Sequence, residues 1–257
     1  MGVALSLATL LLLAAGKPPE DPCQEARSEA LPYELNTTVI PAPKGIDWNA
    51  KAKDASKQVP EIGVALQTPK PWNGKPAVEP LLEAIHDPDY NVSGSALTAL
   101  GHLFGGDPGQ GRQAVVVTHV VRGILEMMRG HDHAFDPDTT IVAQPSGDPD
   151  LDQILMASGT LVTIGKASAS ELLKSLRDPG SPVLHHIQAQ ALGPVRGVAL
   201  IGDLKAETEA EVRRRLALAI AMAGLTRDKR AMELARDEAD PVIRCLLESS
   251  PKAAAAK

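Results

Sequence analysis

Aromatic side chains are scarce in this chain of 257 residues, which holds two Trp, two Tyr and two Phe. Hydrophobic residues still make up 44% of the sequence, so a core must be built from Ala, Leu, Val, Ile and Met. Ala and Leu favour helices, whereas β-sheets favour aromatic and β-branched residues. The composition therefore disfavours β-sandwiches, β-barrels and nucleic-acid binders that stack bases on aromatic rings.

Basic tracts and paired cysteines are also missing. The net charge is −6 and no run of Lys or Arg stands out, so we expect no nucleic-acid partner. Cys23 and Cys245 are far apart, which excludes a CxxC redox motif and a thiolate zinc site. In an oxidising compartment the two could form a disulfide, and otherwise they are free thiols. The sequence leaves both possibilities open.

One apolar run, over residues 3–16, lies near the start of the sequence. It is shorter than the roughly 20 residues that a transmembrane helix needs, and it ends in Ala14, Ala15 and Gly16. This pattern predicts a signal peptide over residues 1–16, although no Lys or Arg precedes the run. We therefore expect a periplasmic or secreted protein with no membrane span in the mature chain. The alternative is an uncleaved apolar anchor.

Proline is concentrated in residues 17–76, which hold ten of the 21 prolines. That density interrupts helical periodicity and predicts an irregular arm or linker, with one short helix near residues 47–59. Trp48 and Trp72 lie in this arm. We expect them to contact a protein partner, because large aromatic side chains dominate contact energies.

From residue 77 onward the pattern becomes helical and repeats. In the first unit, Val92, Ala96, Ala99 and Leu100 fall on one face of a helix. An acidic residue precedes the second helix of each unit. Most of these acidic residues come about 30 positions after the preceding one. These residues are Asp87, Asp148, Asp178, Glu207 and Asp237. A repeat of this length predicts stacked helix pairs, an α-solenoid over residues 77–250 followed by a tail over 251–257.

The unit Asp-Pro-Asp-x-x-Val-x-x-x-Ala-x-x-Ala-Leu-Gly at residues 87–101 resembles the short bacterial HEAT-like repeat, of the kind found in phycobilisome-lyase-type proteins. Val212-Arg213-Arg214 resembles its Val-Arg element. The resemblance implies an all-α solenoid and a non-catalytic protein-interaction scaffold without a cofactor, or an accessory subunit of an envelope complex. No residue suggests lyase activity.

The repeat pattern divides into about five antiparallel helix pairs. The predicted helices are 77–86 with 92–104, 112–129 with 150–165, 168–177 with 183–193, 195–205 with 208–224, and 228–236 with 240–249. The second pair is interrupted by residues 130–149. Three X-Pro pairs in that segment favour an insertion over a degenerate sixth repeat.

This insertion suggests three readings. His131 and His133, with nearby aspartates, are candidate metal ligands. Phe135 is a candidate contact for a partner, because insertions in repeat proteins often lie on the binding face. A solvated loop is the third reading. The metal interpretation predicts a function other than a scaffold, namely a metal-binding or metal-dependent module. It requires a third ligand within reach of both histidines.

Arginine makes the last two predicted pairs locally basic. Arg213, Arg214 and Arg244 are candidate partner-binding residues, as a patch for an anion or an acidic partner. Alternatively, these arginines form ion pairs with acidic residues of the adjacent unit. The glutamates just before Arg213 favour this alternative.

Three further histidines carry structural predictions. Adjacent residues point about 100° apart on a helix, so one of His185 and His186 is expected at the surface and the other in the packing. His119 lies in an apolar run and is expected to be buried or half-buried.

Overall fold

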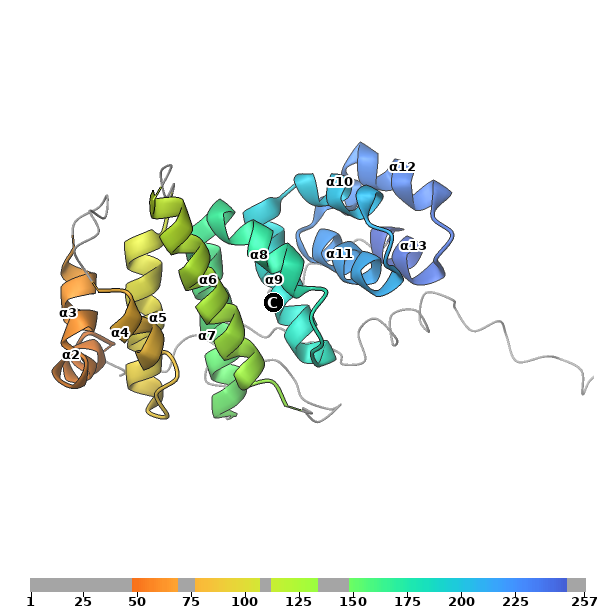
Figure 1. Cartoon of the computed structure of the whole chain (residues 1–257). Coiled ribbons are helices and arrows are strands. Elements are labelled where there is room, and N and C mark those ends of the chain that lie inside the picture. Colours follow the sequence, from red (N-terminus) through yellow and green to blue (C-terminus); the bar gives the residue numbers. More distant parts are fainter. Residues whose placement is uncertain (1–47, 69–76, 107–111, 134–147, 249–257) are drawn as a thin grey trace, which may run out of the picture.

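The computed structural model describes residues 48–68, 77–106, 112–133 and 148–248. Every regular element in these ranges is a helix, and they contain no β-strand (Figure 1). The all-α prediction is therefore confirmed for this part of the chain. No helix found there is both long and apolar enough to cross a membrane. The predicted signal peptide, most of the predicted arm and the predicted tail lie outside the described residues.

The helices from α4 onward lie within a few residues of those predicted from the repeat pattern. In chain order, the structure has α2 (Trp48–Gln58), α3 (Pro60–Gln67), α4 (Glu79–Ala84), α5 (Tyr90–Phe104), α6 (Arg112–Gly130), α7 (Pro149–Ile164), α8 (Ala169–Ser175), α9 (Pro182–Arg196), α10 (Ala199–Ala206), α11 (Ala210–Met222), α12 (Lys229–Asp237) and α13 (Pro241–Glu248), with short 3-10 helices at Gly165–Ser168 and Leu225–Arg227.

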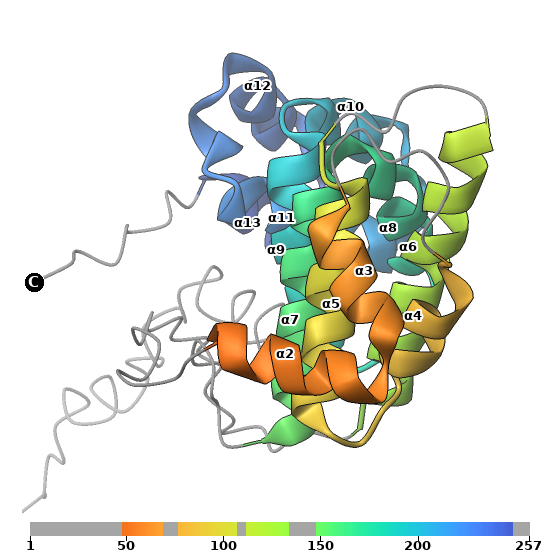
Figure 2. The ribbon, with the colours of Figure 1, turned by 90° about the vertical axis from the view of Figure 1, so that its left-hand side faces the viewer.

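Odd-numbered helices pack against one another in sequence order. α3 packs against α5, α5 against α7, α7 against α9, α9 against α11, and α11 against α13. Each of α4, α6, α8, α10 and α12 packs against the helix that follows it. Figures 1 and 2 show the odd-numbered helices following one another along the molecule, with α4, α6 and α8 to one side. We call α3, α5, α7, α9, α11 and α13 the odd-numbered row.

Short polar side chains determine where helices of this row begin. Asp89 and Asp148 are the N-caps of α5 and α7, and each carboxylate accepts a hydrogen bond from a backbone N–H of the first turn. Ser181 caps α9 in the same way, and Asp240 accepts from two N–H groups at the start of α13. Proline follows three of these caps, at a position where a helix needs no N–H donor.

The predicted irregular arm is helical over its described residues. α2 matches the short helix expected near residues 47–59, whereas α3 is an additional helix. Pro60 stands at the first position of α3, so it starts the helix instead of interrupting it. Ile62 and Ala65 are fully buried, and α2 and α3 both pack against α5. The helical body therefore begins before the boundary expected at residue 77.

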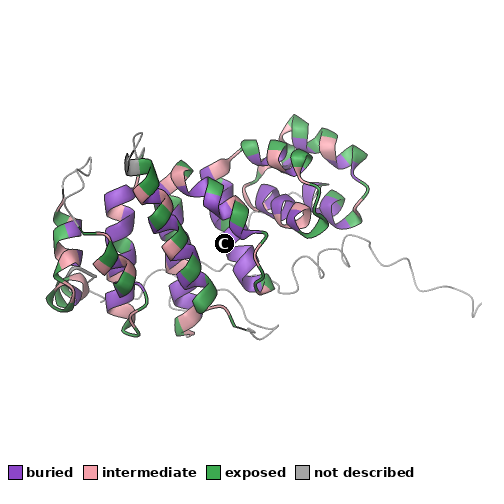
Figure 3. Cartoon of the chain, in the orientation of Figure 1, coloured by how far each residue is buried: buried purple, intermediate pink, exposed green. Residues whose placement is uncertain are grey.

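The core is aliphatic, as the composition predicts. Its buried side chains are mostly Leu, Ile, Val and Ala, and Phe104 is the aromatic residue among them in the described part of the chain. Figure 3 shows α5, α7, α9, α11 and α13 buried along most of their length, while α3, α6 and α12 expose one side. Small residues allow close packing: a Cβ on Gly193 of α9 would lie only 3.0 Å from the Cβ of Ala223.

Candidate functional site

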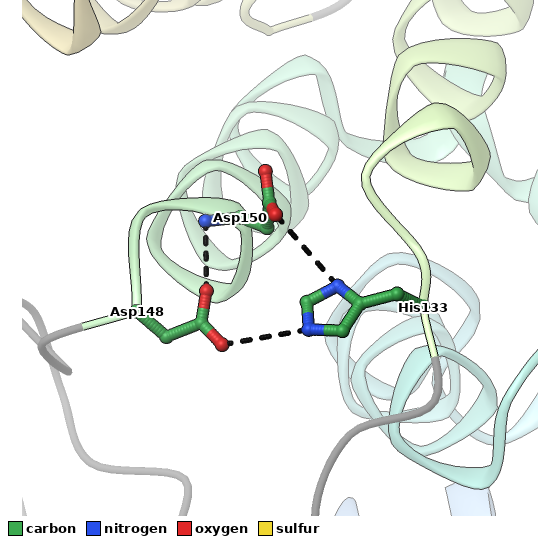
Figure 4. Close-up of side chains that lie close together, drawn as sticks. All are labelled: His133, Asp148 and Asp150. Carbon is green, nitrogen blue, oxygen red and sulfur yellow. Dashed lines mark hydrogen bonds and ion pairs between the residues drawn. The ribbon is translucent and has the colours of Figure 1, made fainter.

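A histidine and two aspartates gather where the end of α6 meets the start of α7 (Figure 4). The Nε2 atom of His133 lies 3.7 Å from Oδ2 of Asp148, and its Nδ1 atom lies 3.7 Å from Oδ2 of Asp150. One ligand atom from each residue lies within 4.8 Å of those from the other two. We call these three residues the His133 cluster.

Helix capping and a second histidine position this cluster. The Oδ1 atom of Asp148 accepts hydrogen bonds from the N–H groups of Asp150 at 2.9 Å and Leu151 at 3.2 Å, so Oδ2 faces His133. The other carboxylate oxygen of Asp150 lies 2.7 Å from Nδ1 of His131. Asp150 therefore contacts both histidines, but His131 is not one of the three residues whose ligand atoms lie within 4.8 Å of one another.

Imidazole nitrogens together with carboxylate oxygens suit a divalent transition metal such as zinc. Two ligand atoms on one tetrahedral zinc ion stand about 3.4 Å apart, close to the 3.7 Å of each His133 contact. However, the two contacts involve different ring nitrogens of His133. A histidine coordinates a metal ion through only one of its two ring nitrogens, so both contacts cannot belong to the same ion as they stand. An ion held by His133 and Asp148 therefore needs a rotation of Asp150 or of the ring to gain the second carboxylate.

A further aspartate of the same turn connects helices. Asp132 accepts hydrogen bonds from the backbone N–H of Ser181 at 2.7 Å and from its hydroxyl at 2.5 Å. Ser181 is the N-cap of α9. The described start of the predicted insertion, residues 131–133, is therefore attached to both α7 and α9.

The three arginines singled out in the sequence meet at the junction of α12 and α13. Arg213 forms an ion pair with Glu238, and Arg214 pairs with Asp240 at 2.9 Å. Arg244 donates two hydrogen bonds to the backbone carbonyl of Glu238, at 2.7 and 3.1 Å. The Glu238 residue is only 8% exposed. These guanidinium groups are thus engaged by acidic residues and carbonyls within the chain, as one of the two sequence readings expected.

Other ion pairs between helices were not evident from the sequence. Arg122 on α6 donates to Glu171 on α8 at 2.8 Å, and this bond lowers the pKa of the Glu171 carboxyl. The sequence does contain a sign of these pairs: Arg122 and Arg129 are seven residues apart on α6, and this spacing places them on one face of the helix. The further pairs are Arg129 with Asp178 and Arg177 with Glu207.

Two predictions about histidines are wrong. His185 and His186 are both buried, each 5% exposed, although one was expected at the surface. Both are enclosed because α9 is packed by α7, α8 and α11 on different sides. His119 is exposed and pairs with Glu79 at 3.1 Å, because the apolar run of α6 also carries a solvent-facing side.

Several buried polar atoms have no hydrogen-bond partner among the described residues. They include Oε1 of Gln153, Oε1 of Gln188 and both ring nitrogens of His186. Burial lowers the pKa of His186 to about 4, so its ring is neutral at pH 7. A buried polar group without a partner costs about 1–3 kcal/mol.

Cys245, on α13, is disulfide-bonded and 4% exposed. This excludes the alternative of two free thiols. The sequence holds one other cysteine, Cys23, which lies outside the described residues. Cys23 is therefore the partner that the chain itself offers.

A small pocket lies at the C-terminal end of the odd-numbered row. It is lined by Met232, Ala235 and Arg236 of α12 and by Leu247 and Glu248 of α13. Met232 is 47% exposed, which is unusual for a large apolar side chain in this molecule. An apolar centre with charged residues around it is a composition typical of protein contacts.

The aromatic residues expected to contact a partner lie at or beyond the edges of the described structure. Trp48 is the first residue of α2, and its side chain is outside the described part. Trp72 and Phe135 also lie outside it. Their role in partner binding stays a prediction.

Comparisons with known proteins identify no relative. No protein-family model, no curated protein and no solved structure matches this chain. The evidence for its function is therefore the geometry described above.

Proposed function

We propose that this chain is a non-catalytic protein-interaction scaffold, built as an α-solenoid of HEAT-like helix pairs. The observation that carries this proposal is the packing order, in which each odd-numbered helix from α3 to α13 packs against the next. A linear array of this kind offers a long surface instead of one enclosed cavity, which suits a protein partner. The repeats that the sequence resembles mostly serve as binding scaffolds.

Ion pairs between successive units support the repeat interpretation. Arg177 and Glu207 are 30 residues apart in the sequence, and Arg214 and Asp240 are 26 apart. These separations are close to the length of the sequence repeat. Such contacts join each unit to its neighbour, and nearest-neighbour contacts are the main source of stability in a solenoid.

We place the partner contact at the pocket between α12 and α13. Arg213, Arg214 and Arg244 are engaged within the chain, so they are poorer candidates than the sequence suggested. Met232 is exposed beside Leu247 and offers apolar area to a partner. Apolar anchors surrounded by polar groups contribute most of the energy of protein contacts.

The same proposal includes an extracytoplasmic location, periplasmic or secreted. The disulfide at Cys245 supports it, because such bonds persist in oxidising compartments and are rare in the cytosol. The apolar residues 3–16 provide the expected export signal. An accessory subunit of an envelope complex would combine this location with a scaffold role.

Affinity capture from the source cells tests the scaffold proposal. The baits are the tagged full chain, a Met232→Glu variant and a Val115→Glu control, since Val115 is also apolar and is 71% exposed on α6. We expect the unchanged chain and the control to retain the same partner and Met232→Glu to lose it. A full chain that stays monomeric and retains no protein contradicts the scaffold role, and equal capture by both variants contradicts this contact site.

The His133 cluster supports a second candidate function, zinc binding. We propose that zinc binds through His133 and Asp148, with Asp150 or His131 completing the set. Elemental analysis and calorimetric titration of the full chain test this. We expect zinc to bind the unchanged chain and a His119→Ala control, which also loses a histidine paired with a carboxylate, but not His133→Ala. A chain that takes up no zinc contradicts the site.

A further inference from the structure

The even-numbered helices stack less continuously than the odd-numbered row. α4 packs against α6 and α6 against α8, whereas α10 packs against α9, α11 and α12. In the described part of the chain, α8 and α10 do not pack against each other to a comparable extent. Figure 1 shows α10 to α13 as a group at one end of the molecule, beyond α8 and α9. On this side the array therefore divides into two segments, α2–α9 and α10–α13.

On the other side, helix packing joins the two segments. α9 packs against α11, and a Cβ on Gly193 of α9 would lie only 3.0 Å from the Cβ of Ala223, the C-cap of α11. The chain crosses between the segments one turn further along, at Gly197, whose φ is 55°. Beside this crossing, Arg196 pairs with Asp203 of α10 at 2.7 Å. Close packing and the continuous chain thus hold this side together.

Two arginines join the segments on the even-numbered side, at residues 176–181, which we call the α8–α9 turn. Arg177 in this turn forms an ion pair with Glu207, the C-cap of α10. Arg215 of α11 donates a hydrogen bond to the backbone carbonyl of Leu176, the C-cap of α8. Leu176 and Arg177 are adjacent, so both contacts reach the same point of the α2–α9 segment.

The α8–α9 turn is itself attached to the α2–α9 segment. Arg129 of α6 pairs with Asp178 at 2.6 Å. Asp132, just after α6, accepts hydrogen bonds from Ser181 at 2.7 and 2.5 Å. Nε2 of His185 on α9 lies 3.1 Å from the backbone carbonyl oxygen of Asp178. The turn is therefore a fixed point to which Arg177 and Arg215 connect the other segment.

The two sides of this junction differ in the kind of contact that holds them. The α9–α11 side buries apolar surface, which is the main favourable term in helix packing. On the other side, the side chain of Arg177 is 48% exposed, and ion pairs that water reaches contribute little. Loss of the two arginine contacts would therefore free one side while the other stays packed, which is the arrangement of a hinge.

We propose that Arg177 and Arg215 form a latch that fixes the angle between the α2–α9 and α10–α13 segments, and that the array bends about the α9–α11 contact when the latch opens. Bending moves the pocket between α12 and α13 relative to the helices of the α2–α9 segment. A partner that contacts both segments then selects one angle. This inference does not depend on the scaffold role.

Distance measurements by double electron–electron resonance test the latch in the full chain. Spin labels are attached to p-acetylphenylalanine, so that the cysteines are left as they are. One label pair, at Glu83 of α4 and Glu233 of α12, spans the two segments. The other pair, at Glu83 and Ser170 of α8, lies within the α2–α9 segment. All three positions are exposed.

The test variant is Arg177→Met/Arg215→Met, and the control is Arg129→Met. Arg129 also reaches the α8–α9 turn, but from α6 within the same segment. We expect the test variant to shift and broaden the Glu83–Glu233 distances and to leave the Glu83–Ser170 distances unchanged. The control should change neither, because Asp132 and His185 still hold the turn.

The variants must keep the helical circular dichroism of the unchanged chain. If the double variant does not fold, Glu207→Gln removes the charge that Arg177 meets and tests the ion pair alone. The measurements are repeated in a Cys23→Ser/Cys245→Ser chain, because the disulfide at Cys245 can itself restrain α13. Glu83–Glu233 distances that stay unchanged in both backgrounds overturn the latch, and so does an equal change in Arg129→Met.

Discussion

At the scale of single residues, charged side chains of this protein mainly join one helix to another. Glu238 is a buried example: its carboxylate pairs with Arg213 and accepts the N–H of Asp240 at 3.0 Å. A buried carboxylate is tolerated only with such partners, because desolvation of an unpaired charge is costly. The basic residues that the sequence suggests as a binding patch therefore have partners within the chain.

Removing the Arg213 charge is expected to destabilise the protein strongly. Arg213→Met should lower the free energy of unfolding by about 3–5 kcal/mol, because Glu238 stays buried without its cation. Adding Glu238→Gln to that variant should restore part of the loss. Urea unfolding measures both. The control is Arg230→Ala, whose side chain is 59% exposed and pairs with Asp228, and it should lower the free energy of unfolding far less than Arg213→Met does. Equal losses at Arg213 and Arg230 would contradict this role.

The buried His186 ring is expected to make stability depend on pH. Its pKa is about 4 in the folded chain, against 6.5 for the ordinary side chain, so the unfolded chain binds the proton more tightly. The contribution of the neutral His186 ring to the free energy of unfolding is fully present above pH 6.5. It is lost as the pH falls toward 4. The difference corresponds to roughly 3 kcal/mol. Urea unfolding at several pH values in this range gives the free energy of unfolding as a function of pH. This free energy should change less with pH in His186→Phe than in the exposed-site control His119→Phe. Identical slopes would contradict the assignment.

At the scale of helices, close packing depends on small residues at particular positions. A Cβ on Gly193 of α9 would stand 3.0 Å from the Cβ of Ala223 and 3.6 Å from the carbonyl oxygen of Ala219. A Cβ on Gly202 of α10 would meet nothing within 4 Å. The same residue type thus has a packing role in one helix and no packing role in the other.

Substitutions at these two glycines should have opposite effects. Gly193→Leu is expected to force α9 and α11 apart and to lower the free energy of unfolding by about 1–3 kcal/mol. Gly202→Ala should raise it by about 0.5–1 kcal/mol, because alanine favours the helix and meets no neighbour. Thermal and urea unfolding give both values. A neutral Gly193→Leu variant would mean that α9 and α11 are less closely packed than described.

Helix positions could be predicted well because their signals are local. Asp148 followed by proline, and the stripe of Val92, Ala96 and Leu100, each depend only on neighbours in the chain. α3 was missed because Pro60 reads as a breaker until its place at the first helical position is known. His185 and His186 were misjudged because helices on several sides enclose α9, which periodicity on one helix does not reveal.

At the scale of the whole molecule, the disulfide at Cys245 is the covalent link that the structure adds to the packing of the helices. With Cys23 as its partner, it closes a loop from residue 23 to residue 245. Each helix of the odd-numbered row packs against the one before it and the one after it, and a row built in this way can open from its ends. A covalent link between the N-terminal segment and α13 opposes that opening.

Reduction of the disulfide should lower thermal stability. Loop-closure entropy for so long a loop corresponds to about 5 kcal/mol. We expect the unfolding temperature of the full chain to fall in dithiothreitol to that of a Cys23→Ser/Cys245→Ser chain, which should not respond to the reagent. Calorimetry measures both, and peptide mapping without reductant identifies the bonded pair. An unfolding temperature that reductant leaves unchanged would contradict a stabilising role for the bond.

The sequence by itself determined the helical class, the aliphatic core and the approximate position of most helices, because composition, caps and periodicity act over a few neighbouring residues. Only the tertiary structure decided which distant residues meet. His133 reaches Asp148 and Asp150 because α6 packs against α7, and Arg213 reaches Glu238 where α12 and α13 join. Such pairs depend on the rotation and spacing of packed helices, which side chains from several segments set together.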